Sequence, residues 1–226
     1  MPENNVLLQQ VMQRYTIYAP LTGVNQEFIA ALLHAFEDNT FNAGDFDDFP
    51  IELIVEYIER THVFYLQTKL PEIEQSILLL SEQYTSQHPI LAALENFFHR
   101  YCQDLTAHIQ AEETKLLPYI ALLLRNVGAS RHYNEYIFAP GQYSIAQFLA
   151  DHHDTEDELK DIRETIQLYD PPVTNASLYR ILLMQLQTFE QDLCVHAHIE
   201  DEVLIPRVLQ MERILHKRVG RITGLN

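Results

Sequence analysis

The stretch DLTAHIQAEETKLLP, from Asp104 to Pro118, recurs as DLCVHAHIEDEVLIP, from Asp192 to Pro206. Both copies read Asp-Leu-x-x-His-x-x-x-Glu-x-x-x-Leu-(Leu/Ile)-Pro. Because a His and a Glu four residues apart share one face of a helix, each copy presents an imidazole and a carboxylate on the same side. Two such helices facing each other would bring two imidazoles and two carboxylates to a common point. The repeat therefore predicts a metal site.

The composition is that of an ordinary globular protein. The 226 residues suit one domain, or one domain with a small appendage, and 47% of them are apolar, enough for a core without disulfides. The formal net charge of -17 argues against electrostatic binding to nucleic acid or to an anionic membrane. No apolar run reaches the length of a membrane span, and the start MPENNVLLQQ lacks the features of a signal peptide. Two widely spaced cysteines without a CxxC motif favour a cytoplasmic protein.

Helical periodicity predicts an all-α protein in two parts. Two short helices are expected over 4–19 and 24–37, and the turn-rich stretch from Asn39 to Pro50 predicts a boundary between a small helical N-terminal region, 1–45, and a larger domain, 46–226. The larger domain contains four long helical patterns, at about Ile51–Gln83, Ile90–Asn126, Ser144–Tyr169 and Ala176–Val219. Pro71 is expected to bend or restart the first of them. Together they predict an antiparallel up-down-up-down four-helix bundle.

Histidines occur in every long helical pattern, at heights that are compatible in an antiparallel bundle. They are His62 in the first, His99 and His108 in the second, His152 and His153 in the third, and His196, His198 and His216 in the fourth. Imidazole and carboxylate donors suit iron, zinc or manganese, and two Glu with four His are too many for one tetrahedral zinc. Two cations sharing bridging carboxylates would accommodate this set and leave a position open for oxygen or nitric oxide. We therefore expect a di-iron centre.

The spacing also argues against two other classes of metalloprotein. Ferritin-like proteins repeat Glu-x-x-His, which occurs here only at Glu59–His62. No His-Glu-x-x-His sequence occurs, so a metalloprotease is not supported.

The segments HIQAEETKLLP, DHHDTEDEL and HAHIEDEVLIP, with ERTHVFYLQTKLPEIE upstream, resemble hemerythrin-like domains of the iron–sulfur cluster repair (RIC) type over roughly residues 51–210. The resemblance implies a non-haem centre of two iron ions with an oxo or hydroxo bridge, and a role under nitrosative or oxidative stress. Carried over by position, the ligands that it implies are His62, His108, Glu112, His153, His196 and Glu200, with Glu112 and Glu200 bridging.

Two features depart from the pattern of this family. Full repair proteins carry an N-terminal domain with an adjacent cysteine pair, whereas residues 1–45 resemble that domain in length and position but contain no cysteine. Relatives often have a second His directly after the first ligand, whereas Val63 follows His62. The missing cysteine pair puts in doubt any function that depends on it.

Three functions remain open. The first is a di-iron protein of iron–sulfur cluster repair or of the response to nitric oxide and oxygen stress, with iron–sulfur proteins as partners. The second is a module that binds oxygen or nitric oxide reversibly, without turnover. The third is a metal-free helical interaction protein, in which His108/Glu112 and His196/Glu200 would be solvated pairs.

Several neighbouring residues have either a role at the site or an ordinary structural one. Asp104 and Asp192, each four residues before a ligand His, would orient its second nitrogen or be solvated. Tyr65 and Tyr101 would line a pocket or belong to the core. Asp157 is expected to be a surface acid, and Cys102 and Cys194 to be small, buried and unreactive. The histidines expected outside the metal shell are His34, His88, His99, His132, His198 and His216.

Overall fold

The computed structural model describes residues 25–37, 41–83, 89–127, 144–151, 163–164 and 176–223. Within these ranges all the regular secondary structure is helical, and they contain no strand. The predicted all-α class is therefore confirmed. The helix predicted over 4–19 lies outside the described residues, whereas the helix predicted over 24–37 is α2 (Gln26–Glu37).

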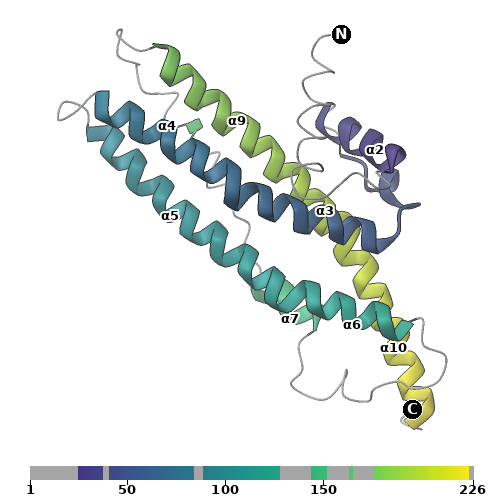
Figure 1. The fold of residues 1–226 in the computed structure, drawn as a ribbon. Helices are drawn as coiled ribbons and strands as arrows, with labels where there is room; N and C mark the ends of the chain where they lie inside the picture. The colour runs from purple at the N-terminus through teal and green to yellow at the C-terminus, as the bar shows by residue number, and fades with distance from the viewer. Residues whose placement is uncertain are drawn as a thin grey trace.

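Three long helices form the body of the molecule, and each consists of two α-helical parts joined by a π-helical turn. They are α3–η2–α4 (Ile51–Phe64, Tyr65–Lys69, Leu70–Gln83), α5–η3–α6 (Pro89–Ala111, Glu112–Leu116, Leu117–Val127) and α9–η5–α10 (Ala176–His198, Ile199–Leu204, Ile205–Thr223). The first runs opposite to the other two (Figure 1), and all three have nearly the predicted limits. None of the described helices combines the length and the apolar character needed to cross a bilayer.

Each π turn lies directly before a Leu-Pro or Ile-Pro pair. Proline has no N–H, and its ring clashes with the carbonyl four residues back, so it disturbs the regular hydrogen-bond ladder of an α-helix. In all three helices the residue before the proline donates its N–H to the carbonyl five residues back: Leu70 to Tyr65, Leu117 to Glu112 and Ile205 to Glu200. The wider turn accommodates the proline, and the helix continues. The interruption predicted at Pro71 takes this form.

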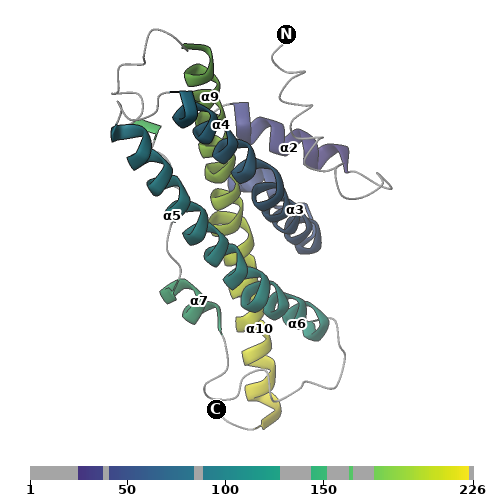
Figure 2. The ribbon, with the colours of Figure 1, turned by 60° about the vertical axis from the view of Figure 1, so that its left-hand side comes forward.

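Only part of the third predicted helix lies within the described residues. It comprises α7 (Ile145–Asp151) and the helical pair 163–164. Ile145 and Phe148 of α7 are buried in one apolar cluster with side chains of α6 and α10. The helix α7 itself lies beside α10 (Figure 2). Arg163 forms an ion pair with Glu190 of α9. Both parts therefore pack on the long helices, and the fold is the predicted four-helix bundle with a small N-terminal helix.

The N-terminal helix packs directly on the bundle. The ring of Phe28 in α2 lies edge-on against Phe46 of η1 (Ala43–Phe46), Phe49 and Tyr57, at centroid distances of 5.9, 5.0 and 6.1 Å. Gln191 of α9 donates a hydrogen bond to the backbone carbonyl of Phe36 (2.7 Å). The division between 1–45 and 46–226 stays a prediction, and residues on both sides of it share one apolar core.

The buried apolar side chains form two clusters, one toward each end of the bundle. The α10-end cluster combines α2, η1, α3, α6, α7, η5 and α10, with Val195 of α9, and the α4-end cluster combines η2, α4, α5 and α9, with Phe64 of α3. Between the two clusters, the three long helices contribute buried polar side chains: Thr61, His62, Glu112, Asp192, His196 and Glu200. A polar layer therefore separates two apolar cores, and we call it the polar layer below.

Candidate metal centre

Five of the six predicted ligands lie within the described residues, and all five come together in or beside the polar layer. They are His62 on α3, His108 and Glu112 around the α5–η3 junction, and His196 and Glu200 around the α9–η5 junction. Four are buried, and the side chain of His108 is 15% exposed. The sixth predicted ligand, His153, lies outside the described residues.

The carboxylate of Glu112 lies between two imidazoles. Its Oε1 is 2.7 Å from Nε2 of His108, one turn earlier on the same helix, and its Oε2 is 2.9 Å from Nε2 of His62 on the facing helix. In the second copy of the motif, Nε2 of His196 is 3.9 Å from Oε2 of Glu200. All three histidines therefore turn the same ring nitrogen, Nε2, toward a carboxylate.

Two sets of donor atoms are compact enough to hold a cation each. One donor atom from each of His62, Glu112 and His196 lies within 4.8 Å of the others, and the same holds for His108, Glu112 and Glu200. Glu112 belongs to both sets, so its two oxygens are available to two neighbouring cations. Imidazole nitrogen and carboxylate oxygen are donors that iron, manganese and zinc accept. The residues present therefore fit the metal centre predicted from the sequence.

Because Glu112 and Glu200 are buried, their negative charges need to be compensated. Glu112 is 0% and Glu200 2% exposed, and a carboxylate removed from water is costly unless hydrogen-bond donors or positive charge face it. Imidazoles face Glu112, and a bound cation would compensate the charge of both glutamates. By contrast, the side chains of His198 and Glu202, also four residues apart, are 42% and 51% exposed. The repeated His/Glu pairs are thus buried, unlike a solvated surface pair.

The second ring nitrogen of two histidines has a partner that the sequence analysis did not identify. Nδ1 of His62 is 3.1 Å from Oε1 of Glu113, and Nδ1 of His196 is 2.8 Å from Oγ1 of Thr61. The only signal for either partner was its position next to a predicted ligand. Neutral histidines that bind metals commonly donate their other N–H to such an oxygen, which fixes the ring orientation.

Asp104 and Asp192, for which an orienting role and a solvated one were both open, lie in different environments. Asp104 is exposed, whereas Asp192 is 0% exposed. The hydroxyl of Tyr65 donates to the backbone carbonyl of Asp192 (3.2 Å), which ties η2 to α9. Tyr65 and Tyr101 are both buried in the α4-end cluster, so they belong to the core.

Glu59 and Glu113 form an acidic pair beside His62. Burial raises the pKa of the Glu59 carboxyl above its usual range, and the like charge of Glu113 raises it further, whereas His62 opposes the shift. Glu59 belongs to neither donor set. The single Glu-x-x-His spacing, Glu59–His62, is therefore not used as it is in ferritin-like proteins.

The described histidines that were predicted to lie outside the metal shell belong to neither donor set: His34, His99, His198 and His216. Nδ1 of His34 is 3.1 Å from Asp45, and the ring of His198 stacks on Phe41 at 5.1 Å. The other residues for which a role was considered lie outside the described part of the chain: His88, His132, His152 and Asp157.

The two cysteines are not alike. Burial, with a smaller contribution from the charge of Glu74, raises the pKa of the Cys102 thiol to about 12, so this thiol stays protonated at neutral pH, as an unreactive cysteine would. Cys194 was predicted to be buried and is exposed, because it faces away from the core on α9. Its Sγ is 3.7 Å from Nδ1 of His198, one turn later.

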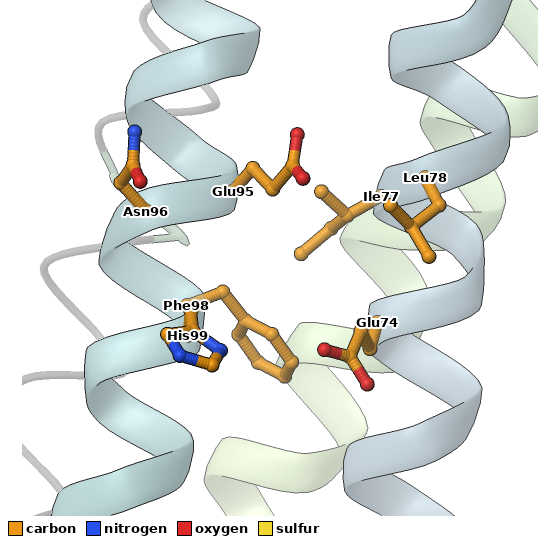
Figure 3. A pocket seen from close by; sticks show the side chains of 7 residues that line it. All are labelled: Glu74, Ile77, Leu78, Glu95, Asn96, Phe98 and His99. Atoms are coloured by element: carbon orange, nitrogen blue, oxygen red, sulfur yellow. The ribbon is translucent and has the colours of Figure 1, made fainter.

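A pocket of about 250 Å³ opens between α4 and α5, within the extent of the α4-end cluster (Figure 3). Its lining combines two carboxylates with apolar side chains: Glu74, Ile77, Leu78, Glu95, Asn96, Phe98 and His99. It includes none of the predicted ligands, so it is distinct from the group of donor atoms in the polar layer.

Comparison with known proteins agrees with the chemistry of the polar layer. The family model described as the hemerythrin HHE cation binding domain matches residues 70–208. The iron–sulfur cluster repair protein ScdA of Staphylococcus haemolyticus is 22% identical over 151 residues, which are 67% of this chain and 64% of that protein. ScdA of Staphylococcus epidermidis is 20% identical over 158 residues, with 70% and 66% covered. The iron–sulfur cluster repair protein YtfE of Yersinia pseudotuberculosis is 24% identical over 188 residues, with 81% and 77% covered.

The chain spans just under two thirds of the length of the two staphylococcal relatives. The family match extends over more than half of the chain and includes both copies of the repeated motif, Asp104–Pro118 and Asp192–Pro206. The chain therefore belongs to the hemerythrin HHE cation-binding domain family.

Proposed function

We propose that this protein binds two non-haem iron ions and acts in iron–sulfur cluster repair under nitric oxide or oxygen stress. The proposed ligands are His62, His108, Glu112, His153, His196 and Glu200, with Glu112 and Glu200 bridging the two ions. The observation that carries the proposal is the membership of Glu112 in both donor sets. The similarity to ScdA and YtfE, which are iron–sulfur cluster repair proteins, supports the choice of process.

The number and kind of donors support iron over a single structural zinc. A structural zinc site is usually closed by four ligands, whereas five donors already meet here and His153 would add a sixth. No thiolate takes part, because the two cysteines lie outside both donor sets. Nitrogen and oxygen donors shared between two positions suit a pair of irons.

The residues of this chain would orient the metal ligands and keep water away from the bound ions. Nε2 of His62, His108 and His196 faces the carboxylates, and the apolar clusters above and below the polar layer limit the access of water. A bound di-iron centre would supply one-electron redox chemistry and an open position for a small ligand such as oxygen or nitric oxide. Because residues 1–45 contain no cysteine, this chemistry would have to occur at the His/Glu group.

The decisive experiment is a metal analysis of the protein purified without a histidine tag. We expect about two irons per chain, and stoichiometric zinc or no metal would overturn the proposal. Revival of a nitrosylated iron–sulfur enzyme by the loaded protein would then support repair. Ultraviolet–visible spectra of the reduced protein with each gas, combined with no revival, would instead favour reversible binding of oxygen or nitric oxide. The two widely spaced cysteines favour a cytoplasmic location within this proposal.

A further inference from the structure

The first long helix contains an altered copy of the repeated motif. In the two HxxxE copies, the His lies ten residues and the Glu six residues before the proline: His108 and Glu112 before Pro118, and His196 and Glu200 before Pro206. The first helix has the same proline, Pro71, after the same kind of π turn, and the residues at the two corresponding positions are Thr61 and Tyr65. The predicted ligand His62 is displaced by one residue from that register.

Thr61 and Tyr65, which occupy the positions of the His and the Glu in this altered copy, both contact His196 of the second copy. Oγ1 of Thr61 is 2.8 Å from Nδ1 of His196, and the ring of Tyr65 lies edge-on to the imidazole, with centroids 5.6 Å apart. Thr61 is 0% and Tyr65 1% exposed. The hydroxyl of Tyr65 also donates to the carbonyl of Asp192, one turn before His196. The first helix therefore holds both the imidazole and the turn of α9 that carries it.

The other partners of the Thr61 hydroxyl bear on the direction of the Thr61–His196 contact. The hydroxyl of Thr61 lies 2.8 Å from the carbonyl of Ile58 and 3.1 Å from that of Tyr57, and carbonyl oxygens only accept. Threonine in a helix commonly donates its single hydroxyl proton to such a carbonyl of its own helix. With the proton placed there, the oxygen can only accept toward His196, which requires a proton on Nδ1 of His196.

We propose that Thr61 is a positioning residue that holds His196 as the Nδ1–H tautomer and aims its Nε2 at the polar layer. Nε2 is the nitrogen that faces Glu200, and His196 belongs to the donor set with His62 and Glu112. The value of this tautomer for metal binding rests on the proposed function, but the tautomer itself is a property of the metal-free protein. The two parts can therefore be tested separately.

The tautomer is read from long-range ¹H–¹⁵N correlation spectra of the imidazole rings in the metal-free, full-length protein. The His196 signals are assigned with His196→Gln, at a pH of about 8, above the ordinary imidazole pKa of about 6.5. We expect the Nδ1–H pattern in the wild type and a shift toward Nε2–H or a mixture in Thr61→Val. Thr61→Ser keeps the hydroxyl and should restore the wild-type pattern.

A matched control separates loss of the imidazole contact from loss of a hydroxyl–carbonyl bond within a helix. Thr188 donates to the carbonyl of Met184 (2.8 Å) on the same helix as His196, and it is half-buried. Thr188→Val should therefore leave the His196 spectrum unchanged. An Nε2–H pattern for His196 in the wild type would overturn the proposal without any variant, and so would an unchanged pattern in Thr61→Val.

Titration with Co²⁺ against a competing chelator measures the consequence for the metal site. Loss of a partner that orients a ligand histidine typically weakens metal binding roughly 10- to 100-fold, and we expect Thr61→Val to fall in that range. Thr61→Ser and Thr188→Val should bind as the wild type does. Equal affinity of Thr61→Val and the wild type would refute the positioning role. A wild type that binds no Co²⁺ or iron but shows the Nδ1–H tautomer would refute the proposed function and leave the assignment of the tautomer standing.

Discussion

The two copies of the repeated motif have the same residue pattern but different surroundings. In the first copy, His108 is partly exposed and its Nε2 is 2.7 Å from Glu112, while Asp104 is exposed. In the second copy, His196 is buried, its Nε2 is 3.9 Å from Glu200, and the residue that corresponds to Asp104, Asp192, is 0% exposed.

The difference comes from what packs against each copy. The first long helix places Thr61 and Tyr65 against His196, whereas toward the first copy it presents His62, which reaches the carboxylate of Glu112. As a result Glu112 joins both donor sets and Glu200 joins one. The comparison teaches that a repeated motif can supply unequal halves of one site, because the neighbouring helix is not symmetric.

The largest expected effect is the loss of bound iron when Glu112 or Glu200 is replaced by uncharged Gln, and it tests the difference between the two copies. We expect Glu112→Gln to lose nearly all bound iron and Glu200→Gln to lose less, because Glu112 belongs to both donor sets and Glu200 to one. A metal that binds only the folded state stabilises it by about 2.7 kcal/mol at 100 times its Kd, so Glu112→Gln should also lose the difference in stability with and without chelator. Metal analysis and urea unfolding measure the two quantities. Equal losses in the two variants would contradict the asymmetry.

The second test compares the two aspartates in the metal-free protein. Asp192→Ala removes a fully buried side chain and leaves a cavity, so it should lower the free energy of unfolding by roughly 0.5–3 kcal/mol. Asp104→Ala alters an exposed position and should change it by no more than about 0.5 kcal/mol. Urea unfolding with chelator present gives both values. If the two substitutions had the same effect, the difference in burial between the copies would have no energetic consequence.

A smaller effect concerns stability at alkaline pH near the first copy. The pKa of the Cys102 thiol is raised from 9.0 to about 12 by burial and by Glu74, so the folded protein keeps this proton where the unfolded chain loses it. The free energy of unfolding should therefore fall as the pH rises from 9 toward 12. Unfolding of Cys102→Ala over this range should show a shallower decline than the wild type. Cys194→Ala, the matched variant of the second copy, should decline as the wild type does.

The smallest expected effect is on chemical labelling of the two thiols, which need not alter stability. Cys194 is exposed and should react with iodoacetamide in the folded protein, whereas Cys102, with its raised pKa and partial burial, should react only after unfolding. Peptide mass spectrometry with and without denaturant distinguishes the two sites. Labelling of both at the same rate in the native protein would show that their environments do not differ.

Much of the fold could be predicted because its signals are local. The apolar periodicity of Ile51–Gln83, Pro89–Val127 and Ala176–Thr223 marks the helices almost to their ends. The buried position of Glu112, His196 and Glu200 agrees with the repeat, since residues four apart must share a helix face. The π turns were not predicted, although the Leu-Pro pair at 70–71 repeats the proline of both motif copies.

Other features depend on contacts between distant parts of the chain. The exposure of Cys194 was predicted incorrectly because it depends on which face of α9 the other helices leave open. Glu113 and Thr61 were missed because each acts on a histidine from another helix, and no spacing within one helix encodes such a contact.

The sequence by itself determined the helices, the pairing of His with Glu on one face, and the nitrogen and oxygen donors, because these follow from periodicity and residue chemistry. Only the tertiary structure decided that Glu112 belongs to both donor sets and Glu200 to one, and that Thr61 contacts His196. The physical reason is that these relations depend on the register and rotation of helices packed side by side. Side-chain packing along their whole length sets both, and no single motif does.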